Sequence, residues 1–276
     1  MTVLIIGGSG FLGTELVRQA AASSEHATAA TFSTRPGNTP KVPWHALDLR
    51  DSARIEALMA EVQPRVVINA TSGGPDWPIT AEGPIRLAMA TAKYGSRLVH
   101  VSSDAVFSGA RVHYDESCLP DPLTPYGAAK AAAETGIRLV NPNAVIARTS
   151  LIIGDRRSEH VRAVHDLAAG TRTGVLFTDD IRCPIHVTDL AAALLELAHG
   201  NRSGIHHLAG PEAISRYELG TLIAKRDNLD PTRLATGRRA ATTLPGPLDV
   251  RLNSQSTQAT LQTHLRGVYQ FLTTHP

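Results

Sequence analysis

Short apolar runs alternate with stretches of helical periodicity through the first 150 residues of the chain. The apolar runs predict strands, and apolar positions spaced three to four residues apart predict amphipathic helices. Strands are predicted at residues 3–6, 27–32, 44–46, 66–68, 98–101 and 144–147, and helices at 12–22, 52–62, 84–94 and 125–140. This alternation indicates βαβ units and a parallel sheet. We therefore predict an α/β fold with a doubly wound parallel sheet, which binds ligands beyond the carboxyl ends of its strands.

The first strand runs directly into a glycine-rich turn. Gly7, Gly10 and Gly13 have the spacing G-x-x-G-x-x-G, and Phe11 and Leu12 begin the following helix. Gly7 would allow the tight turn, Gly10 the close approach of a pyrophosphate, and Gly13 the packing of the helix on the sheet. Free N–H groups and the helix dipole favour an anion at this helix end. The turn therefore predicts a Rossmann-type dinucleotide site, and a turn that binds nothing is the alternative.

Residues at later strand ends indicate which dinucleotide would bind. A domain that prefers NAD usually carries Asp or Glu after the second strand, whereas this chain has Ser33 and Arg35 there. A guanidinium can hold a 2′-phosphate, so NADP(H) is favoured and NAD(H) is the second choice. A solvated loop arginine is the alternative interpretation of Arg35. Further cofactor contacts are expected from Asp48, Leu49, Ala70 and Thr71.

A strand that ends in Ser103 is followed by a helix with a distinctive first turn. Thr124 is a suitable N-cap and Pro125 a suitable first residue of that helix. Tyr126 and Lys130 are four residues apart, so they share one face. A nearby ammonium, together with an oxidised nicotinamide, would lower the pKa of Tyr126 and make it a proton donor near neutral pH. An ordinary surface pair is the alternative, which the glycine turn and the serine strand end disfavour.

The regular alternation ends after residue 153. Later elements are predicted at 159–169 (helix), 175–177 (strand), 212–224 (helix) and 256–273 (helix). The first domain is accordingly expected at 1–153, and 154–276 is expected to form mainly a smaller C-terminal substrate-binding lobe with segments that return to the first domain. Arg156, Arg157 and Arg182 are candidates for a substrate diphosphate, because guanidinium groups bind phosphate oxygens bidentately. Solvated loop charge is an equally weighted alternative.

Composition excludes several other classes of protein. The chain has 276 residues, 42% of them hydrophobic, and no apolar run approaches the roughly 20 residues that span a bilayer. Its formal charge of +2 is spread along the chain, which argues against a nucleic-acid surface. Cys118 and Cys183 form neither a disulfide framework nor a zinc site, and no histidines have the spacing of metal ligands. Because the first apolar residues already form a strand and not a secretory leader, we expect a cytoplasmic protein without a bound metal.

Several motifs together carry a resemblance to a known family. VSSDAVFSG at 101–109, PYGAAK at 125–130 and PIHVTDLA at 184–191 are the main ones, and the likeness continues at 204–219 and 246–253. With the glycine turn, they resemble the extended short-chain dehydrogenase/reductase superfamily and, more narrowly, the dTDP-4-dehydrorhamnose reductase family. The resemblance implies a Rossmann domain that holds the cofactor and a C-terminal lobe that closes over a nucleotide-sugar.

The resemblance also implies roles for individual residues. By position, Ser103, Tyr126 and Lys130 correspond to a catalytic triad, with Ser103 where these reductases generally have Thr. The implied reaction reduces a keto group of a nucleotide-activated sugar, with hydride from the nicotinamide and a proton from Tyr126. Ala105 stands where dehydratases of the superfamily carry Glu, which disfavours a dehydratase. Tyr126 and Lys130 are also expected to contact the cofactor, Lys130 at the nicotinamide ribose. Substrate contacts are expected from Ser72, Asp104, Arg156 and Arg182.

Two other functions remain open from the motifs. An epimerase of the same superfamily can carry the same Ser, Tyr and Lys, but it returns the hydride to its substrate. A regulatory protein can bind NAD(P) without turnover, although retention of all three catalytic side chains argues against this. The identity of the sugar and of the base is not determined, and neither is the oligomeric state, for which a homodimer is one option.

Overall fold

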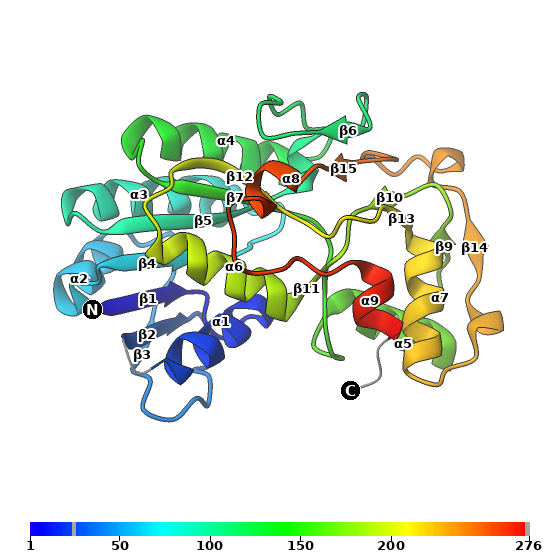
Figure 1. Ribbon diagram of the computed structural model, residues 1–276, viewed down its shortest axis with the longest axis horizontal. Helices are drawn as coiled ribbons and strands as arrows, with labels where there is room; N and C mark the ends of the chain where they lie inside the picture. The colour runs from blue at the N-terminus through cyan, green and yellow to red at the C-terminus, as the bar shows by residue number, and fades with distance from the viewer. Residues whose placement is uncertain (24–25, 274–276) are drawn as a thin grey trace.

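A seven-stranded parallel sheet is the centre of the computed structural model, which describes residues 1–23 and 26–273 (Figure 1). The strands lie in the order β12-β7-β5-β4-β1-β2-β3, and every neighbouring pair is parallel. Their bounds are β1 (Thr2–Ile6), β2 (Ala27–Phe32), β3 (Trp44–Ala46), β4 (Val66–Asn69), β5 (Arg97–Ser103), β7 (Val145–Thr149) and β12 (Gly204–Leu208). The order reverses between β1 and β4, where the loops that follow the two strands diverge and ligands bind in such sheets. The predicted α/β class and doubly wound sheet are confirmed.

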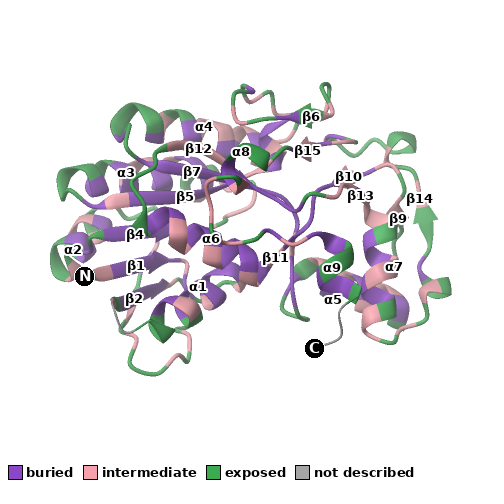
Figure 2. Cartoon of the chain, in the orientation of Figure 1, coloured by how far each residue is buried: buried purple, intermediate pink, exposed green. Residues whose placement is uncertain are grey.

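Helices cover both faces of the sheet. On one face lie α1 (Phe11–Ala22) and α6 (Val187–His199), and on the other lie α2 (Ser52–Val62), α3 (Gly83–Lys93) and α4 (Pro125–Val140). The inner strands β1, β4, β5 and β7 are buried along nearly their whole length, and the edge strands β3 and β12 are less buried, whereas the helices are buried only on their inward sides (Figure 2). Burial on both faces explains why these strands are continuous apolar runs in the sequence.

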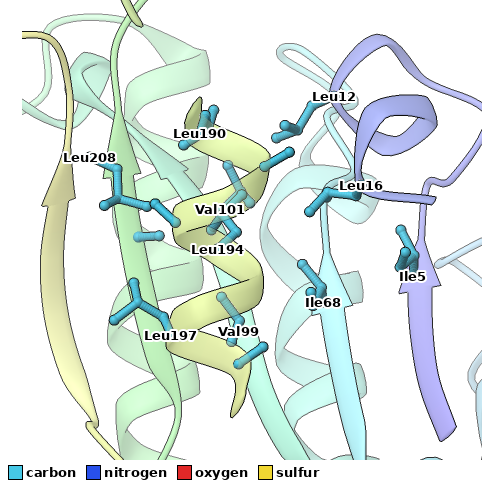
Figure 3. Packing of buried hydrophobic residues seen from close by; sticks show 14 of the residues in the cluster. Ile5, Leu12, Leu16, Ile68, Val99, Val101, Leu190, Leu194, Leu197 and Leu208 are labelled. Carbon is cyan, nitrogen blue, oxygen red and sulfur yellow. The ribbon is translucent and has the colours of Figure 1, made fainter. Parts of the chain in front are cut away.

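Side chains alternate along each strand between two hydrophobic cores. Ile5 and Ile68 point toward the core under α1 and α6, while Leu4 points toward the core under α2, α3 and α4. Figure 3 shows Leu190 and Leu194 of α6 lying over the strands in the first of these cores. Each fully buried aliphatic side chain contributes roughly 1.5–3 kcal/mol to folding. The two cores hold the carboxyl ends of the strands in fixed positions.

A smaller lobe lies beyond these carboxyl ends (Figure 1). Its core joins α5 (Glu159–Ala169), α7 (Arg216–Arg226) and α9 (Val268–Thr273). Short strand pairs lie outside the central sheet, namely β8 (Ile152–Ile153) with β11 (Ile185–His186), β9 (Leu176–Phe177) with β14 (Thr236–Gly237), β10 (Ile181–Arg182) with β13 (Ile214–Ser215), and β6 (His113–Tyr114) with β15 (Arg251–Leu252). The remaining elements are α8 (Gln255–Gln258) and the short turns η1 (Pro78–Glu82), η2 (Asp104–Val106), η3 (Pro231–Arg233) and η4 (Arg239–Ala241).

Most predicted elements of the first half agree with the structure to within two residues, but one helix begins earlier. The helix predicted at 84–94 is preceded by a π-helical turn, η1, that starts at Pro78. Pro84 has no N–H for a regular helical bond, and the N–H of Gly83 donates to the carbonyl of Pro78 instead. The proline therefore widens one turn without ending the helix.

Two predicted helices of the second half are wrong in their extent. The helix predicted at 212–224 begins at Arg216, because Ser215 caps it and Glu212 accepts from the backbone N–H of Val268, at the start of α9. The helix predicted at 256–273 is two short helices, α8 and α9. Between them, the carboxylate of Glu196 on α6 accepts hydrogen bonds from the backbone N–H groups of residues 262 and 263. These hydrogen bonds to another helix replace the ones that a continuous helix would make.

Two elements of the sheet domain were not predicted at all. The helix α6 and the edge strand β12 follow residue 153 in the chain, yet α6 packs on the sheet and β12 pairs with β7. The predicted boundary after residue 153 stays a prediction. No helix within residues 1–23 and 26–273 combines the length and apolar character that membrane crossing requires.

Candidate functional site

A cavity of about 790 Å³ lies where the sheet domain meets the lobe. One wall consists of the glycine turn, the ends of β4, β5 and β7, and the first turns of α4. The opposite wall comes from α5, β10, α7 and the segments around Arg239 and Pro247. We call these the sheet wall and the lobe wall. A cleft of this size at the switch point of an α/β sheet is the expected place for a small-molecule ligand.

The glycine turn forms a tight backbone cradle at one end of the sheet wall. Gly7 has φ of +79°, and its N–H donates to Thr31 Oγ1 at 3.0 Å. A Cβ at Gly13 would lie 2.0 Å from the carbonyl oxygen of Gly7, so no other residue fits. Gly10 precedes α1 without a side-chain cap and lines the cavity with Phe11. The uncapped N–H groups and the close-packed turn fit the pyrophosphate of a dinucleotide.

Packing at the start of α4 brings the residues of the catalytic motif together. Thr124 Oγ1 accepts from the N–H of Gly127 at 3.0 Å, as predicted for an N-cap. A Cβ at Gly127 would lie 2.1 Å from the carbonyl oxygen of Ala105, so the helix sits directly against the turn that follows β5. Tyr126 is thereby hydrogen-bonded with Ser72 and Ser103. Three hydroxyl groups meet at one point of the sheet wall.

Burial shifts the pKa values of two groups in this wall. Burial raises the pKa of Tyr126, and its hydrogen bonds with Ser72 and Ser103 offset only part of that rise. The predicted lowering of this pKa, which required an oxidised nicotinamide beside the phenol, stays a prediction. Lys130 Nζ donates to the carbonyl oxygens of Val101 and Thr71, at 3.0 and 3.4 Å. Burial lowers the pKa of Lys130 itself to about 8.

The lobe wall contains several arginines around one buried carboxylate. Asp180 lies 3.0 Å from Arg182 Nη1, 3.0 Å from Arg239 Nη1 and 3.5 Å from Arg216 Nε. Arg182 also lies 3.7 Å from Asp104, the residue after Ser103. Three guanidinium groups thus share two carboxylates, which leaves this wall with an excess of positive charge. Such a cavity wall attracts an anion.

The model of the family described as RmlD substrate binding domain matches residues 1–274. The chain belongs to this family. Among its relatives, the dTDP-4-dehydrorhamnose reductase of Mycobacterium tuberculosis is 30% identical over 262 residues, which are 89% of this chain and 82% of that protein. Methionine adenosyltransferase 2 subunit beta of Xenopus laevis is 29% identical over 251 residues, which are 84% of this chain and 73% of that protein.

A solved structure extends the similarity of this RmlD-type chain to three dimensions. It is that of a hypothetical dTDP-4-dehydrorhamnose reductase from Sulfolobus tokodaii, with a TM-score of 0.83 and 29% identity. The alignment covers 96% of this chain and 97% of the other. The two chains therefore share both the sheet domain and the lobe.

Several residues predicted for the cofactor lie away from the cavity of this RmlD-type chain. Ser33 and Arg35 are exposed beyond β2, outside the residues that line the cavity. Asp48 is bound by Arg50 at 2.6 Å, and Leu49 is buried in the core under α2. The contact of Leu49 with the cofactor stays a prediction, and its buried side chain leaves the backbone of this residue as the group that could make it. Ala70 and Thr71, in contrast, line the cavity.

The predicted arginines separate into two groups, and others were missed. Arg156 is exposed and does not line the cavity, whereas Arg157 lines it while paired with Asp155 at 2.9 Å. Arg182 lines it from the lobe wall. Arg216 and Arg239 were not predicted. Arg216 falls within the resemblance at 204–219, but a motif does not show which way an arginine side chain points.

The remaining predicted features concern metals and thiols. Cys118 and Cys183 are both free and buried. Burial raises the pKa of the Cys183 thiol to about 12, so it is not a nucleophile. In the part of the chain that the structure describes, no group of three or more His, Cys, Asp or Glu side chains could hold a metal ion.

Proposed function

We propose that this chain is an NADP-dependent reductase of a keto group on a nucleotide-activated sugar. One observation carries the proposal: the hydroxyls of Ser103 and Tyr126, with Lys130 behind them, face an arginine-rich wall across a single cavity that also reaches the glycine turn. The sheet wall can reduce a carbonyl, and the lobe wall can hold a diphosphate. The M. tuberculosis and S. tokodaii relatives support the same activity.

The chain's own groups have distinct parts in this reaction. A bound NADPH supplies the hydride that reduces the carbonyl carbon. Ser103 donates a hydrogen bond to the carbonyl oxygen, and Tyr126 transfers its phenolic proton to that oxygen, so the keto group becomes an alcohol. Stabilising the charge that develops on this oxygen is the main physical effect. Proton transfer by a positioned side chain contributes a further factor of roughly 10² to 10⁴.

The remaining residues hold the cofactor. Gly10, Phe11 and Leu12 would offer backbone N–H groups to the pyrophosphate, since they line the cavity at the start of α1. Lys130 would bind the nicotinamide ribose. Arg35 would bind the 2′-phosphate, which is why NADP(H) is preferred to NAD(H) in this proposal.

The test follows the reduced-nicotinamide absorbance when the protein is mixed with NADPH and dTDP-4-dehydrorhamnose. A reductase consumes one NADPH for each keto group reduced. Isomerisation of a sugar nucleotide without net loss of NADPH would establish an epimerase instead. Binding of NADPH without turnover on a panel of nucleotide-bound keto sugars would overturn both activities.

A second candidate is a cofactor-binding subunit without turnover. The observation that favours it is the X. laevis relative, a methionine adenosyltransferase subunit whose identity to this chain is almost the same as that of the reductase. Ser103, Tyr126 and Lys130 are all present and placed together, which favours the reductase. A cytoplasmic location, a homodimer and the lack of a nucleic-acid partner stay predictions, and sedimentation with and without DNA measures the last two.

A further inference from the structure

We propose that Glu134 is a positioning residue for the reduction, acting through Lys130 and through the strand that ends in Ser103. The inference rests on the proposed function and assigns a part to a buried carboxylate outside the cavity lining. Glu134 is one helical turn beyond Lys130 on α4. Tyr126, Lys130 and Glu134 therefore follow each other at four-residue intervals along one face of this helix.

Glu134 joins three elements beneath the sheet wall. Ser102 Oγ, on β5, donates to Glu134 Oε1 at 2.5 Å. Arg148, on β7, donates from Nη2 to Oε2 at 2.7 Å and from Nε to Oε1 at 3.0 Å. The carboxylate thus connects the residue beside Ser103 to the helix that carries Tyr126. Hydrogen bonds to a charged group in a dry interior are strong and directional, so they can fix the relative position of β5 and α4.

The same carboxylate balances the charges behind the proton donor. Glu134 is 2% exposed, Lys130 2% and Arg148 0%, so two cations and one anion are enclosed together. Burial lowers the pKa of Lys130 to about 8, and the charge of Glu134 opposes that fall. Without Glu134, Lys130 would lose its proton at a lower pH, since the charged form of a buried amine is costly.

The other titratable groups near this network do not replace Glu134. His100, on β5, is fully buried, and burial together with the charge of Lys130 holds its pKa well below the usual range. It is therefore neutral near pH 7. Asp104, after β5, accepts a hydrogen bond from Ser150 Oγ at 2.6 Å and lies 3.7 Å from Arg182 Nε of the lobe wall. Glu134 is the carboxylate whose charge raises the pKa of Lys130.

The first measurement follows the charge of Lys130 directly. The chain contains four lysines, Lys41, Lys93, Lys130 and Lys225, so ¹³Cε-lysine NMR gives few signals and Lys130→Met identifies the relevant one. We expect the titration midpoint of Lys130 to fall by about one pH unit in Glu134→Gln. The alkaline limb of the kcat/KM profile should move to lower pH by the same amount. An unchanged midpoint would overturn the inference.

Glu134→Gln leaves the charge of Arg148 buried without its partner, which can prevent folding. The double variant Glu134→Gln with Arg148→Met removes both charges and keeps the packing volume similar. It should fold and show a downward shift of the Lys130 midpoint that is smaller than in Glu134→Gln, because removing the Arg148 cation favours the charged form of Lys130. Glu134→Asp should return the midpoint toward the value of the unaltered chain. Folded double variants with an unshifted Lys130 would contradict the proposal.

Two controls separate charge from structure. Ser102→Ala removes the hydrogen bond to Glu134 but no charge, so we expect a lower kcat with an unmoved Lys130 midpoint. Asp189→Asn breaks a less buried ion pair with Arg266, at 2.7 Å, at the start of α6 on the opposite face of the sheet from α4. It should lower stability and leave both the midpoint and the pH profile unchanged. A shift in either control equal to that in Glu134→Gln would show that the effect is structural.

The NMR titration needs neither substrate nor turnover. If no keto sugar is reduced, the proposed function fails, but the link between Glu134 and Lys130 is still measured. If NADPH-dependent reduction is observed and the Lys130 midpoint does not move, the inference about Glu134 fails and the proposed function stands.

Discussion

The two walls of the cavity are built on different kinds of structure. The sheet wall places Ser103, Tyr126 and Lys130 on a long strand and a long helix, backed by hydrophobic cores on both faces of the sheet. The lobe wall places Arg182 and Arg239 on short strands and turns, and carbonyl oxygens and Asp180 hold them. The sheet wall positions the group proposed to donate a proton, and the lobe wall presents positive charge.

This difference indicates that proton transfer at the sheet wall and anion binding at the lobe wall can vary separately. Proton transfer needs atoms placed within fractions of an ångström, which rigid strands and helices provide. Attraction of an anion depends on net charge and tolerates looser geometry. A lobe wall made of loops can change its ligand while the sheet wall keeps its chemistry.

The largest expected effect is on the sheet wall. Tyr126→Phe removes the proton donor and keeps the ring, so kcat should fall about 10³-fold. NADPH affinity should stay within a factor of two or so, because the other cofactor contacts remain when one hydroxyl is removed. Single-turnover NADPH oxidation and a fluorescence titration measure the two quantities. A kcat within tenfold of the unaltered chain would remove Tyr126 from the reaction.

The lobe wall should respond in KM and not in kcat. Arg239→Met deletes one charge next to Asp180 and should raise KM for the nucleotide-sugar roughly 10- to 100-fold, the range for a lost hydrogen bond to a charged group. Steady-state kinetics measures the split. Arg162→Met, at an exposed arginine of α5 outside the cavity lining, is the matched control. A large fall in kcat at unchanged KM would contradict the division between the walls.

The sheet domain should also lose stability in acid, through one buried histidine. His207 on β12 is fully buried, and burial lowers its pKa to about 4. The unfolded chain binds its proton near pH 6.5, so stability is lost as the pH falls from 6.5 toward 4. From pH 7 to 4.5 the loss from this residue is about 2 kcal/mol.

Urea unfolding at both pH values checks the expectation for His207. His207→Phe should reduce the difference in unfolding free energy between pH 7 and 4.5 by that amount. His113→Phe changes an exposed histidine and should leave the difference unchanged. An equal pH dependence in all three chains would show that other groups determine acid stability.

The smallest expected effect concerns a residue outside both walls. Arg35 is exposed after β2, so a contact with a 2′-phosphate is solvated and weak. Arg35→Ala should weaken NADPH binding by a factor of about 5 to 10 and leave NADH binding unchanged. Isothermal titration calorimetry with both cofactors compares the dissociation constants. No change for NADPH would refute the role of Arg35.

Local patterns in the sequence determined the strands of the sheet other than β12, the glycine turn and the face shared by Tyr126 and Lys130. These features depend on residues close together in the chain, because strand, turn and helix geometry repeat over a few positions. Gly13 is an example, since its spacing from Gly7 already predicted the close approach that the structure confirms.

Only the tertiary structure decided which distant groups meet. It placed α6 and β12 on the sheet domain, gathered Arg216 and Arg239 around Asp180, and joined Glu134 to Arg148. It also buried Tyr126, which raises the pKa of that group in the chain without its cofactor. Spacing along a helix selects which side chains share a face, but their charge states depend on partners and burial that packing alone supplies.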